Sequence, residues 1–288
     1  DELLFWEIRD WKLVLSGIEG LEICPISNLQ SHFQETILIT IIGIDCATQP
    51  QKTGLAVGTW DGTAVSLHTI TLGQKTQSLA HTIASWLPKD EPTLLAIDAP
   101  LGWPANLGNQ LAIHNAGDPL PFPPNTLFRR ETDRRIWQRT GKLPLDVGAD
   151  RIARTAHAAL TFLAELRHLT QEPIPLVWQQ QPAHKLSAIE VYPGGTLKIM
   201  FDPMRVPRYK GNDRENGRSA ILQHLKQHVT LPTDTHLLQK NDDALDAVLC
   251  VVAGADFLRG LAEPPTNLDQ AQKEGWIWVR TKSEQTNE

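Results

Sequence analysis

Hydrophobic and polar residues alternate along the chain in a way that predicts three consecutive strands. The run over 37–45, Ile-Leu-Ile-Thr-Ile-Ile-Gly-Ile-Asp, is rich in β-branched residues and predicts a buried central strand. Strand-like patterns follow over 53–60 and 63–72, and between them lies Asp61-Gly62, a dipeptide typical of tight hairpins. The first three strands are therefore expected to form an antiparallel meander.

The rest of the chain switches between helical and extended patterns. Apolar residues recur at helical spacing from 75 to 87, and further strands are expected at 93–98 and 187–192. Residues 99–126 are rich in proline and predict a long irregular loop. The other expected segments are helices at about 127–140, 148–169, 195–201, 214–228 and 242–261, then a strand-like piece at 276–279.

This order of elements predicts the topology of an α/β protein. Three antiparallel strands, followed by two strands reached through helical crossovers, give a mixed five-stranded sheet of order 3-2-1-4-5 with helices on both faces. That is the strand order of the ribonuclease H-like fold. We expect this domain to span 37–262, with a helical, proline-rich insertion after the fourth strand at about 99–185. Residues 1–36 are interpreted as an N-terminal extension, and 263–288 as a C-terminal tail.

The composition narrows the class of protein. The chain has 288 residues and a net charge of −6, an acidic balance typical of enzymes rather than of histone-like proteins. Its three cysteines are scattered, which argues against a disulfide framework or a cysteine zinc site and favours a reducing, cytoplasmic location. No apolar run reaches the ~18 residues of a membrane span, so no membrane association is expected.

Four aspartates stand where the predicted fold would bring them together. Asp45 ends the first strand and Asp98 the fourth, and these strands are expected to be parallel neighbours. Asp243 and Asp246 lie three residues apart on the last long helix and share one face. Clustered carboxylates repel each other unless a cation lies among them, and oxygen ligands suit Mg²⁺ or Mn²⁺. We interpret all four as catalytic residues and metal ligands, because two such ions can promote phosphodiester cleavage.

Each aspartate also has a simpler interpretation. An acid that ends a strand before a turn is commonly a turn former, which applies to Asp45 and to Asp98. Asp242 and Asp243 start a helix, where acids cap the helix or offset its dipole. Asp246 is different because it interrupts an apolar stretch, 244–255, that should be buried. A buried carboxylate needs a partner, and the convergence of four acids favours a metal ion in that role.

Glu190 is a fifth candidate ligand. It lies on the fifth predicted strand with Tyr192 on the same face, while Ile189 and Val191 face the other way. A strand covered on both faces leaves little room for an unpaired carboxylate. Its partner is either a metal ion or an arginine of the segment 129–154, and the sequence does not choose between the two.

Basic residues are concentrated in two segments of this acidic chain. Residues 128–154 hold eight Lys and Arg against four Asp and Glu, and residues 185–218 hold seven against four. A local positive surface is what contact with a nucleic-acid backbone requires. The expected contacts are Arg129, Arg130, Arg134, Arg135, Arg139 and Lys210. The alternative is a solvated helix face on which the arginines pair with nearby acids, namely Glu131, Asp133, Asp146 and Asp150.

Five short motifs occur in order along the chain. They are Gly43-Ile-Asp-Cys-Ala, Ile97-Asp-Ala-Pro-Leu-Gly-Trp-Pro, Arg130-Glu-Thr-Asp133, Ile189-Glu-Val-Tyr-Pro193 and Asp242-Asp-Ala-Leu-Asp246. As a set, over about residues 38–262, they resemble the domain-of-unknown-function family 429, whose members are predicted nucleases with a ribonuclease H-like fold. The resemblance implies that the site residues are Asp45, Asp98, Glu190, Asp243 and Asp246.

These features predict a divalent-metal-dependent nuclease that hydrolyses nucleic acid at a carboxylate-bound two-metal site. A non-catalytic nucleic-acid-binding or scaffold protein of the same fold is the alternative. A third class is the actin-like ATPases and sugar kinases, in which Gly-Ile-Asp also ends the first strand. That class needs two such folds and a second glycine-rich loop, whereas this chain shows one copy of the motif.

Overall fold

The structure is a computed structural model of the chain. It describes residues 38–148, 150–180, 184–202 and 204–281, together with three short strands near the N-terminus. The chain divides into two compact units, 1–37 and 38–288. In the first unit, β1 (Phe5–Ile8), β2 (Trp11–Leu15) and β3 (Leu21–Pro25) form an antiparallel sheet in that order. The expected extension, 1–36, falls in this unit and lies largely outside the described residues.

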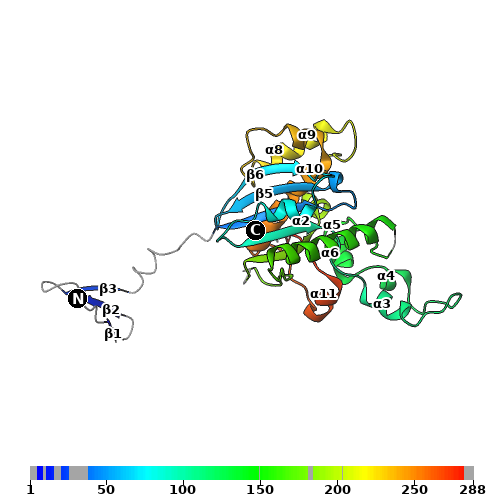
Figure 1. The fold of residues 1–288 in the computed structure, drawn as a ribbon, viewed down its shortest axis with the longest axis horizontal. Helices are drawn as coiled ribbons and strands as arrows, with labels where there is room; N and C mark the ends of the chain where they lie inside the picture. The colour runs from blue at the N-terminus through cyan, green and yellow to red at the C-terminus, as the bar shows by residue number, and fades with distance from the viewer. Residues whose placement is uncertain are drawn as a thin grey trace, which may run out of the picture. The chain divides into compact units, whose positions relative to one another are not determined.

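The described part of the second unit contains a six-stranded sheet of order β6-β5-β4-β7-β8-β9 (Figure 1). Its strands are β4 (Ile39–Asp45), β5 (Gly54–Trp60), β6 (Val65–Leu72), β7 (Thr93–Asp98), β8 (Leu186–Val191) and β9 (Ile277–Trp278). The first three are antiparallel, and β7, β8 and β9 run parallel to β4. The predicted order 3-2-1-4-5 is confirmed. The predicted number of five strands is wrong, because the segment near 276–279 pairs with β8 and adds a sixth.

The hairpin between β5 and β6 follows from its turn residues. Gly62 has a φ of +96°, which glycine adopts without strain. The Asp61 carboxylate accepts hydrogen bonds from the backbone N–H groups of Thr63 and Ala64, at 2.9 and 2.8 Å. Asp61 therefore stabilises the turn that joins the two antiparallel strands.

Helices cover both faces of the sheet, because successive residues of each strand point to opposite sides. Ile41 belongs to the core that packs against α10 (Asp242–Leu258), a helix buried along almost its whole length. Its neighbour Ile42 belongs to the core on the other face, beneath α2 (Leu79–Ala84) and α6 (Asp150–Thr170) (Figure 1). Among the described residues, no helix is long and apolar enough to cross a membrane.

The remaining helices lie in the connections between these elements. They are η1 (Pro50–Lys52), α3 (Ala105–Leu111), α4 (Pro124–Leu127), α5 (Glu131–Thr140), α7 (Pro193–Met200), α8 (Glu215–Leu225), α9 (His236–Lys240) and α11 (Leu268–Glu274). The segment 99–126 was predicted to be irregular, yet it contains α3 and the start of α4. Pro104 and Pro123 directly precede these helices, where the missing N–H of proline breaks no helical hydrogen bond.

Candidate active site

Two aspartates end the adjacent parallel strands at the centre of the sheet. Asp45 is the last residue of β4 and Asp98 the last residue of β7, and the two are direct partners in the parallel register. Both side chains are partly buried, and neither carboxylate accepts a hydrogen bond from another described residue. The sheet therefore brings together the two carboxylates that strand order alone placed side by side.

Asp246 reaches the same edge because α10 packs very close to the sheet. A Cβ atom at Gly43 would collide with the carbonyl oxygen of Ala247, and one at Gly54 would collide with the carbonyl oxygen of Asp243. Only glycine leaves room for the helix backbone at these two positions. The Gly-Ile-Asp sequence of β4 thus serves two purposes: it supplies Asp45 and admits the helix that carries Asp246.

The first turn of α10 is capped by an amide rather than by an acid. The Asn241 side chain accepts a hydrogen bond from the N–H of Ala244 at 2.8 Å. Asp242 instead accepts one from the N–H of Gly211 at 3.0 Å. Burial raises the pKa of Asp243, and Asp242 and Asp246 raise it further. Asp243 lies close enough to add to the negative potential at Asp45, and it does not line the adjacent cavity.

Asp246 is only 1% exposed and is held by two neighbouring side chains. The Tyr209 hydroxyl donates a hydrogen bond to Oδ1 at 2.8 Å, and Lys210 Nζ lies 2.6 Å from Oδ2. The Lys210 side chain is itself 58% exposed. The buried carboxylate therefore has the partner that its burial requires, and in this structure that partner is a lysine.

Asp45, Asp98 and Asp246, called the carboxylate cluster below, act on one another electrostatically. Burial raises the pKa of Asp45 well above its usual value, and the charges of Asp98 and Asp246 raise it further. Burial and the charge of Asp246 raise the pKa of Asp98 to about 7. Burial also raises the pKa of Asp246, against the opposing effect of Lys210. The cluster holds more negative than positive charge, which favours the uptake of a proton or another cation.

A cavity of about 330 Å³ opens beside the carboxylate cluster. Its lining includes Asp45, Asp98, Lys142, Tyr192 and Lys210, whereas the buried Asp246 does not reach its surface. The volume lies in the range of small-molecule sites. A second cavity, of about 320 Å³, lies at the opposite edge of the sheet, where β7 and β8 begin.

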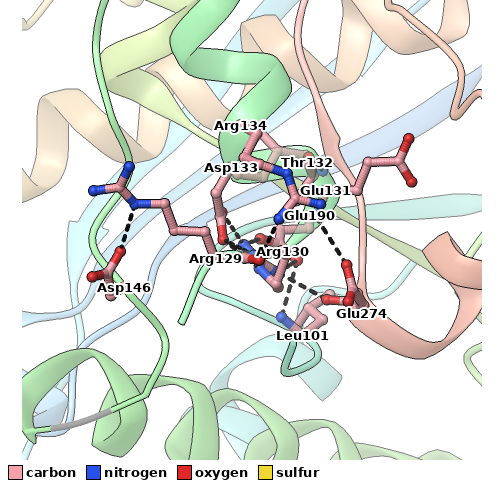
Figure 2. Close-up of polar contacts among 11 residues, drawn as sticks. Leu101, Arg129, Arg130, Glu131, Thr132, Asp133, Arg134, Asp146, Glu190 and Glu274 are labelled. Carbon is pink, nitrogen blue, oxygen red and sulfur yellow. Dashed lines mark hydrogen bonds and ion pairs between the residues drawn. The ribbon is translucent and has the colours of Figure 1, made fainter. Parts of the chain in front are cut away.

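A second charged group lies against the same cavity and is closely paired (Figure 2). Arg130 is 1% exposed, and its Nη2 and Nη1 donate hydrogen bonds to Glu190 Oε1 and Oε2 at 2.7 and 2.9 Å. Its Nε and Nη2 also donate to Asp133, at 3.1 and 2.9 Å. We call these three residues the arginine cluster. Of the two partners that the sequence left open for Glu190, the structure shows the arginine.

Backbone groups complete the arginine cluster. The N–H of Leu101 donates to Glu190 Oε2 at 3.0 Å, and Arg130 Nη1 donates to the carbonyl oxygen of Glu274 at 3.1 Å (Figure 2). Burial lowers the pKa of the Arg130 guanidinium, but Glu190 and Asp133 outweigh it and raise that pKa above its usual value. Both oxygens of Glu190 therefore accept hydrogen bonds from donors of the protein itself.

Several cations predicted to contact nucleic acid are instead engaged within the protein. Arg130 is buried in the arginine cluster, and Lys210 pairs with Asp246. Arg129 Nε lies 3.1 Å from Asp146 Oδ1, a pair drawn at the side of Figure 2. These three residues therefore do not present unpaired charge to a ligand.

The other three predicted contacts lie on α5 and are also engaged. Arg135 forms an ion pair with Glu263, and Arg139 Nε lies 2.8 Å from Oε2 of the same glutamate. Arg134 Nη1 donates a hydrogen bond to the carbonyl oxygen of Arg129 at 2.9 Å. The cluster of arginines in the sequence thus serves largely to join α5 to its surroundings.

Other residues of the basic segment remain available beside the cavity. Arg151 and Arg154 are exposed on α6, next to Ile152 and Thr155, which line the cavity. Neither arginine forms an ion pair with a described residue, and the same holds for Lys142. Sequence reasoning counted all three in the basic segment without selecting them, because only the fold shows that Lys142 lines the cavity and that the two arginines adjoin lining residues of α6.

The carboxylate cluster has the chemistry of a metal site but is not arranged as a closed one. No group of three or more His, Cys, Asp or Glu side chains in the described residues is gathered closely enough to hold a metal ion. Lys210 occupies Oδ2 of Asp246, one of the oxygens that such an ion would use. The donor set itself, carboxylate oxygens with raised pKa values, fits a hard divalent cation.

Comparison with known proteins gives one family. The model of a family described as "Protein of unknown function (DUF429)" matches residues 43–270, which is most of the chain. The match includes every candidate site residue discussed above. A search of curated proteins and a search of solved structures found no match.

Proposed function

The chain belongs to the DUF429 family of proteins of unknown function, and we propose that it is a divalent-metal-dependent nuclease with a ribonuclease H-like fold. The proposed reaction is hydrolysis of a phosphodiester bond of nucleic acid at the carboxylate cluster. The mixed sheet, whose first five strands have the order 3-2-1-4-5, supports the fold assignment. The added sixth strand lies at the far edge of the sheet, away from β4.

The observation that carries the proposal is the surplus of negative charge at the carboxylate cluster. Asp45, Asp98 and Asp246 lie together at the carboxyl edge of the sheet, and Lys210 is paired with Asp246 alone among them. Carboxylates withdrawn from water without full compensation cost free energy, so their retention points to a functional use. In open α/β sheets, ligands bind outside the carboxyl ends of the strands, which is where the cavity lies.

Mg²⁺ or Mn²⁺ is the cofactor that suits this donor set, because hard cations prefer carboxylate oxygens. Asp45 and Asp98 would hold it; Asp246 lies beside them, paired with Lys210, and Asp243 lies close by as a further acid. Glu190 is not assigned as a ligand because Arg130 occupies both of its oxygens. When bound, such an ion supplies Lewis-acid catalysis of phosphodiester cleavage.

The exposed cations beside the cavity support a polyanionic substrate. Arg151 and Arg154 lie on α6 next to cavity-lining residues, and the structure shows no ion pair for either among the described residues. Basic residues without an ion pair, close to an acidic site, attract a phosphate backbone that the carboxylates alone would repel. We therefore propose that these two arginines, rather than the six first selected, contact nucleic acid.

A non-catalytic nucleic-acid-binding protein is the second candidate, and the ion pair between Lys210 and Asp246 favours it. The lysine supplies positive charge where a catalytic ion would bind, so a chain that had lost its metal could keep this geometry. The two candidates differ in one measurable property, which is metal-dependent cleavage.

The test is cleavage of labelled single- and double-stranded DNA and RNA by the full chain in Mg²⁺, Mn²⁺ or EDTA. Asp45→Asn keeps the shape of the side chain but removes the charge that attracts the ion. It is expected to lower the cleavage rate roughly a thousandfold or more while leaving nucleic-acid affinity largely unchanged. The matched control is Asp90→Asn, the same change at an exposed position shortly before β7 begins, at the opposite end of that strand from Asp98. This variant should cleave like the wild type.

Two results would contradict the nuclease proposal. One is a wild-type protein that cleaves none of these substrates with either metal. The other is an Asp45→Asn variant that cleaves as fast as the wild type, which would indicate a contaminating nuclease. Binding of nucleic acid without cleavage would leave the non-catalytic candidate in its place.

A further inference from the structure

Lys142 lies in the cavity beside the carboxylate cluster, on the loop that follows α5. Its side chain is partly buried, and its Nζ lies 5.3 Å from the centroid of the Tyr192 ring. Among the residues that the structure describes, its ammonium group has neither an ion pair nor a hydrogen bond. Because no carboxylate of the described residues contacts this ammonium group directly, the group remains available to pair with an anion of a ligand.

The Lys142 ammonium group lies against Gly194 and Tyr192 in the cavity. Gly194, in the first turn of α7, lies directly against it, and a Cβ atom there would collide with Lys142 Nζ. Tyr192 contributes its ring to the same place. Burial and the nearby charge of Lys210 lower the pKa of Lys142, whereas Asp246 and Asp98 raise it. The lysine is therefore positioned by its neighbours, and it lies in the field of both the second lysine and the carboxylates.

We propose that Lys142 binds a phosphate group of the substrate inside this cavity. The identity of the anion as a phosphate rests on the proposed function. Asp45 and Asp98 line the same cavity and would repel an anion unless a nearby cation offset their charge. A lysine supplies a compact positive charge suited to phosphate, and it adapts its three N–H donors to the oxygens presented. Lys142 thus supplies the positive charge that a phosphate group needs beside Asp45 and Asp98, while Lys210 remains with Asp246.

The test measures binding of inorganic phosphate to the full chain by calorimetry in EDTA, so that neither metal nor cleavage is involved. Lys142→Met keeps the side-chain bulk but removes the charge, and is expected to weaken binding about tenfold or more. Lys142→Gln, which also removes the charge but keeps a polar side chain, should weaken binding too. Lys198→Met removes an exposed lysine one turn further along α7, outside the cavity, and should stay within about twofold of the wild type.

Three outcomes would overturn the inference. They are a wild type that binds no phosphate at about 10 mM, a Lys142→Met variant that binds as tightly as the wild type, and an equal loss in Lys198→Met. Lys142→Arg, which restores the positive charge, is expected to recover binding, and circular dichroism checks that each variant is folded. If Lys142→Met does not fold, Lys142→Gln and Lys142→Arg decide the matter.

The experiment separates this inference from the nuclease proposal. Phosphate binding that depends on Lys142, in a protein that cleaves no nucleic acid, would reject the nuclease and retain the anion site. Metal-dependent cleavage with phosphate binding that does not depend on Lys142 would reject the anion site and retain the nuclease.

Discussion

The carboxylate cluster and the arginine cluster are two buried groups of charges at one cavity, and they differ in how completely they are paired. In the arginine cluster, each N–H of the Arg130 guanidinium has an acceptor, and Glu190 also accepts a backbone N–H. In the carboxylate cluster, Asp246 has two partners, whereas no described residue donates a hydrogen bond to the carboxylates of Asp45 and Asp98. Complete pairing marks charges that hold the fold together, and incomplete pairing marks charges left for a ligand.

This difference also has an energetic side. A fully hydrogen-bonded ion pair offsets most of the free energy lost on burying its charges. Removing one member leaves the other charge buried without a partner, which destabilises the folded protein. An unpaired carboxylate cluster already bears such a cost in the folded protein, so neutralising it should relieve the fold. The two clusters are therefore expected to respond in opposite ways to the removal of charge.

The largest expected effect is the loss of the central cation of the arginine cluster. Arg130→Ala leaves Glu190 and Asp133 buried without their partner and should lower the free energy of unfolding by about 3–5 kcal/mol. Arg129→Ala removes the neighbouring arginine, whose pair with Asp146 is more exposed, and should cost about 0–1 kcal/mol. Urea unfolding of both variants measures the difference, and equal losses would contradict the structural role given to Arg130.

Divalent metal should stabilise the carboxylate cluster and leave the arginine cluster unaffected. Mg²⁺ or Mn²⁺ at a hundredfold excess over its dissociation constant should add about 2.7 kcal/mol and raise the unfolding temperature by a few degrees. Asp45→Asn should lose this stabilisation, whereas Arg129→Ala should retain it. An equal rise in Asp45→Asn would place the metal elsewhere on the chain.

The third expectation concerns pH in the absence of metal. The pKa of Asp98 is raised from 3.8 to about 7, so the folded state binds its proton more tightly than the unfolded state does. Stability from this group is complete below about pH 4 and is lost as the pH rises towards 7. Asp98→Asn should flatten this part of the stability profile in EDTA. A wild-type stability that rises from pH 4 to 7, with the same slope in the variant, would contradict the raised pKa.

The smallest expected effect concerns the exposed cations beside the cavity. Reversing both Arg151 and Arg154 to Glu should weaken oligonucleotide binding about tenfold at low salt and reduce the salt dependence of that binding. Lys185→Glu is the control, because it reverses an exposed charge at the opposite end of the sheet, where β8 begins. Fluorescence anisotropy across a salt series distinguishes a local effect from one of overall charge.

The strands and their order could be predicted because the signals that define them are local. The alternation of apolar residues and the Asp61-Gly62 turn act between residues adjacent in the chain, and the strand order then places Asp45 beside Asp98. The strand-like pattern at 276–279 was visible in the sequence, but its membership of the sheet was not, because β9 joins the sheet only by pairing with β8, which is distant in the chain. The residue at which a strand ends is thus set by local signals, whereas the pairing of a short edge strand with the sheet is not.

The sequence by itself determined which residue types carry charge and on which elements they lie, whereas only the tertiary structure decided which charges meet. It limited the partner of Glu190 to a metal ion or an arginine, and the fold brought Arg130, directly before α5, to the carboxylate of Glu190. It indicated that Asp246 is buried and needs a partner, and the tertiary structure showed that this partner is Lys210, in the loop before α8. It contained no sign that Lys142 borders the cavity. The physical reason is that a pattern reflects interactions between near neighbours in the chain, while ion pairs and cavities depend on through-space distances between distant segments.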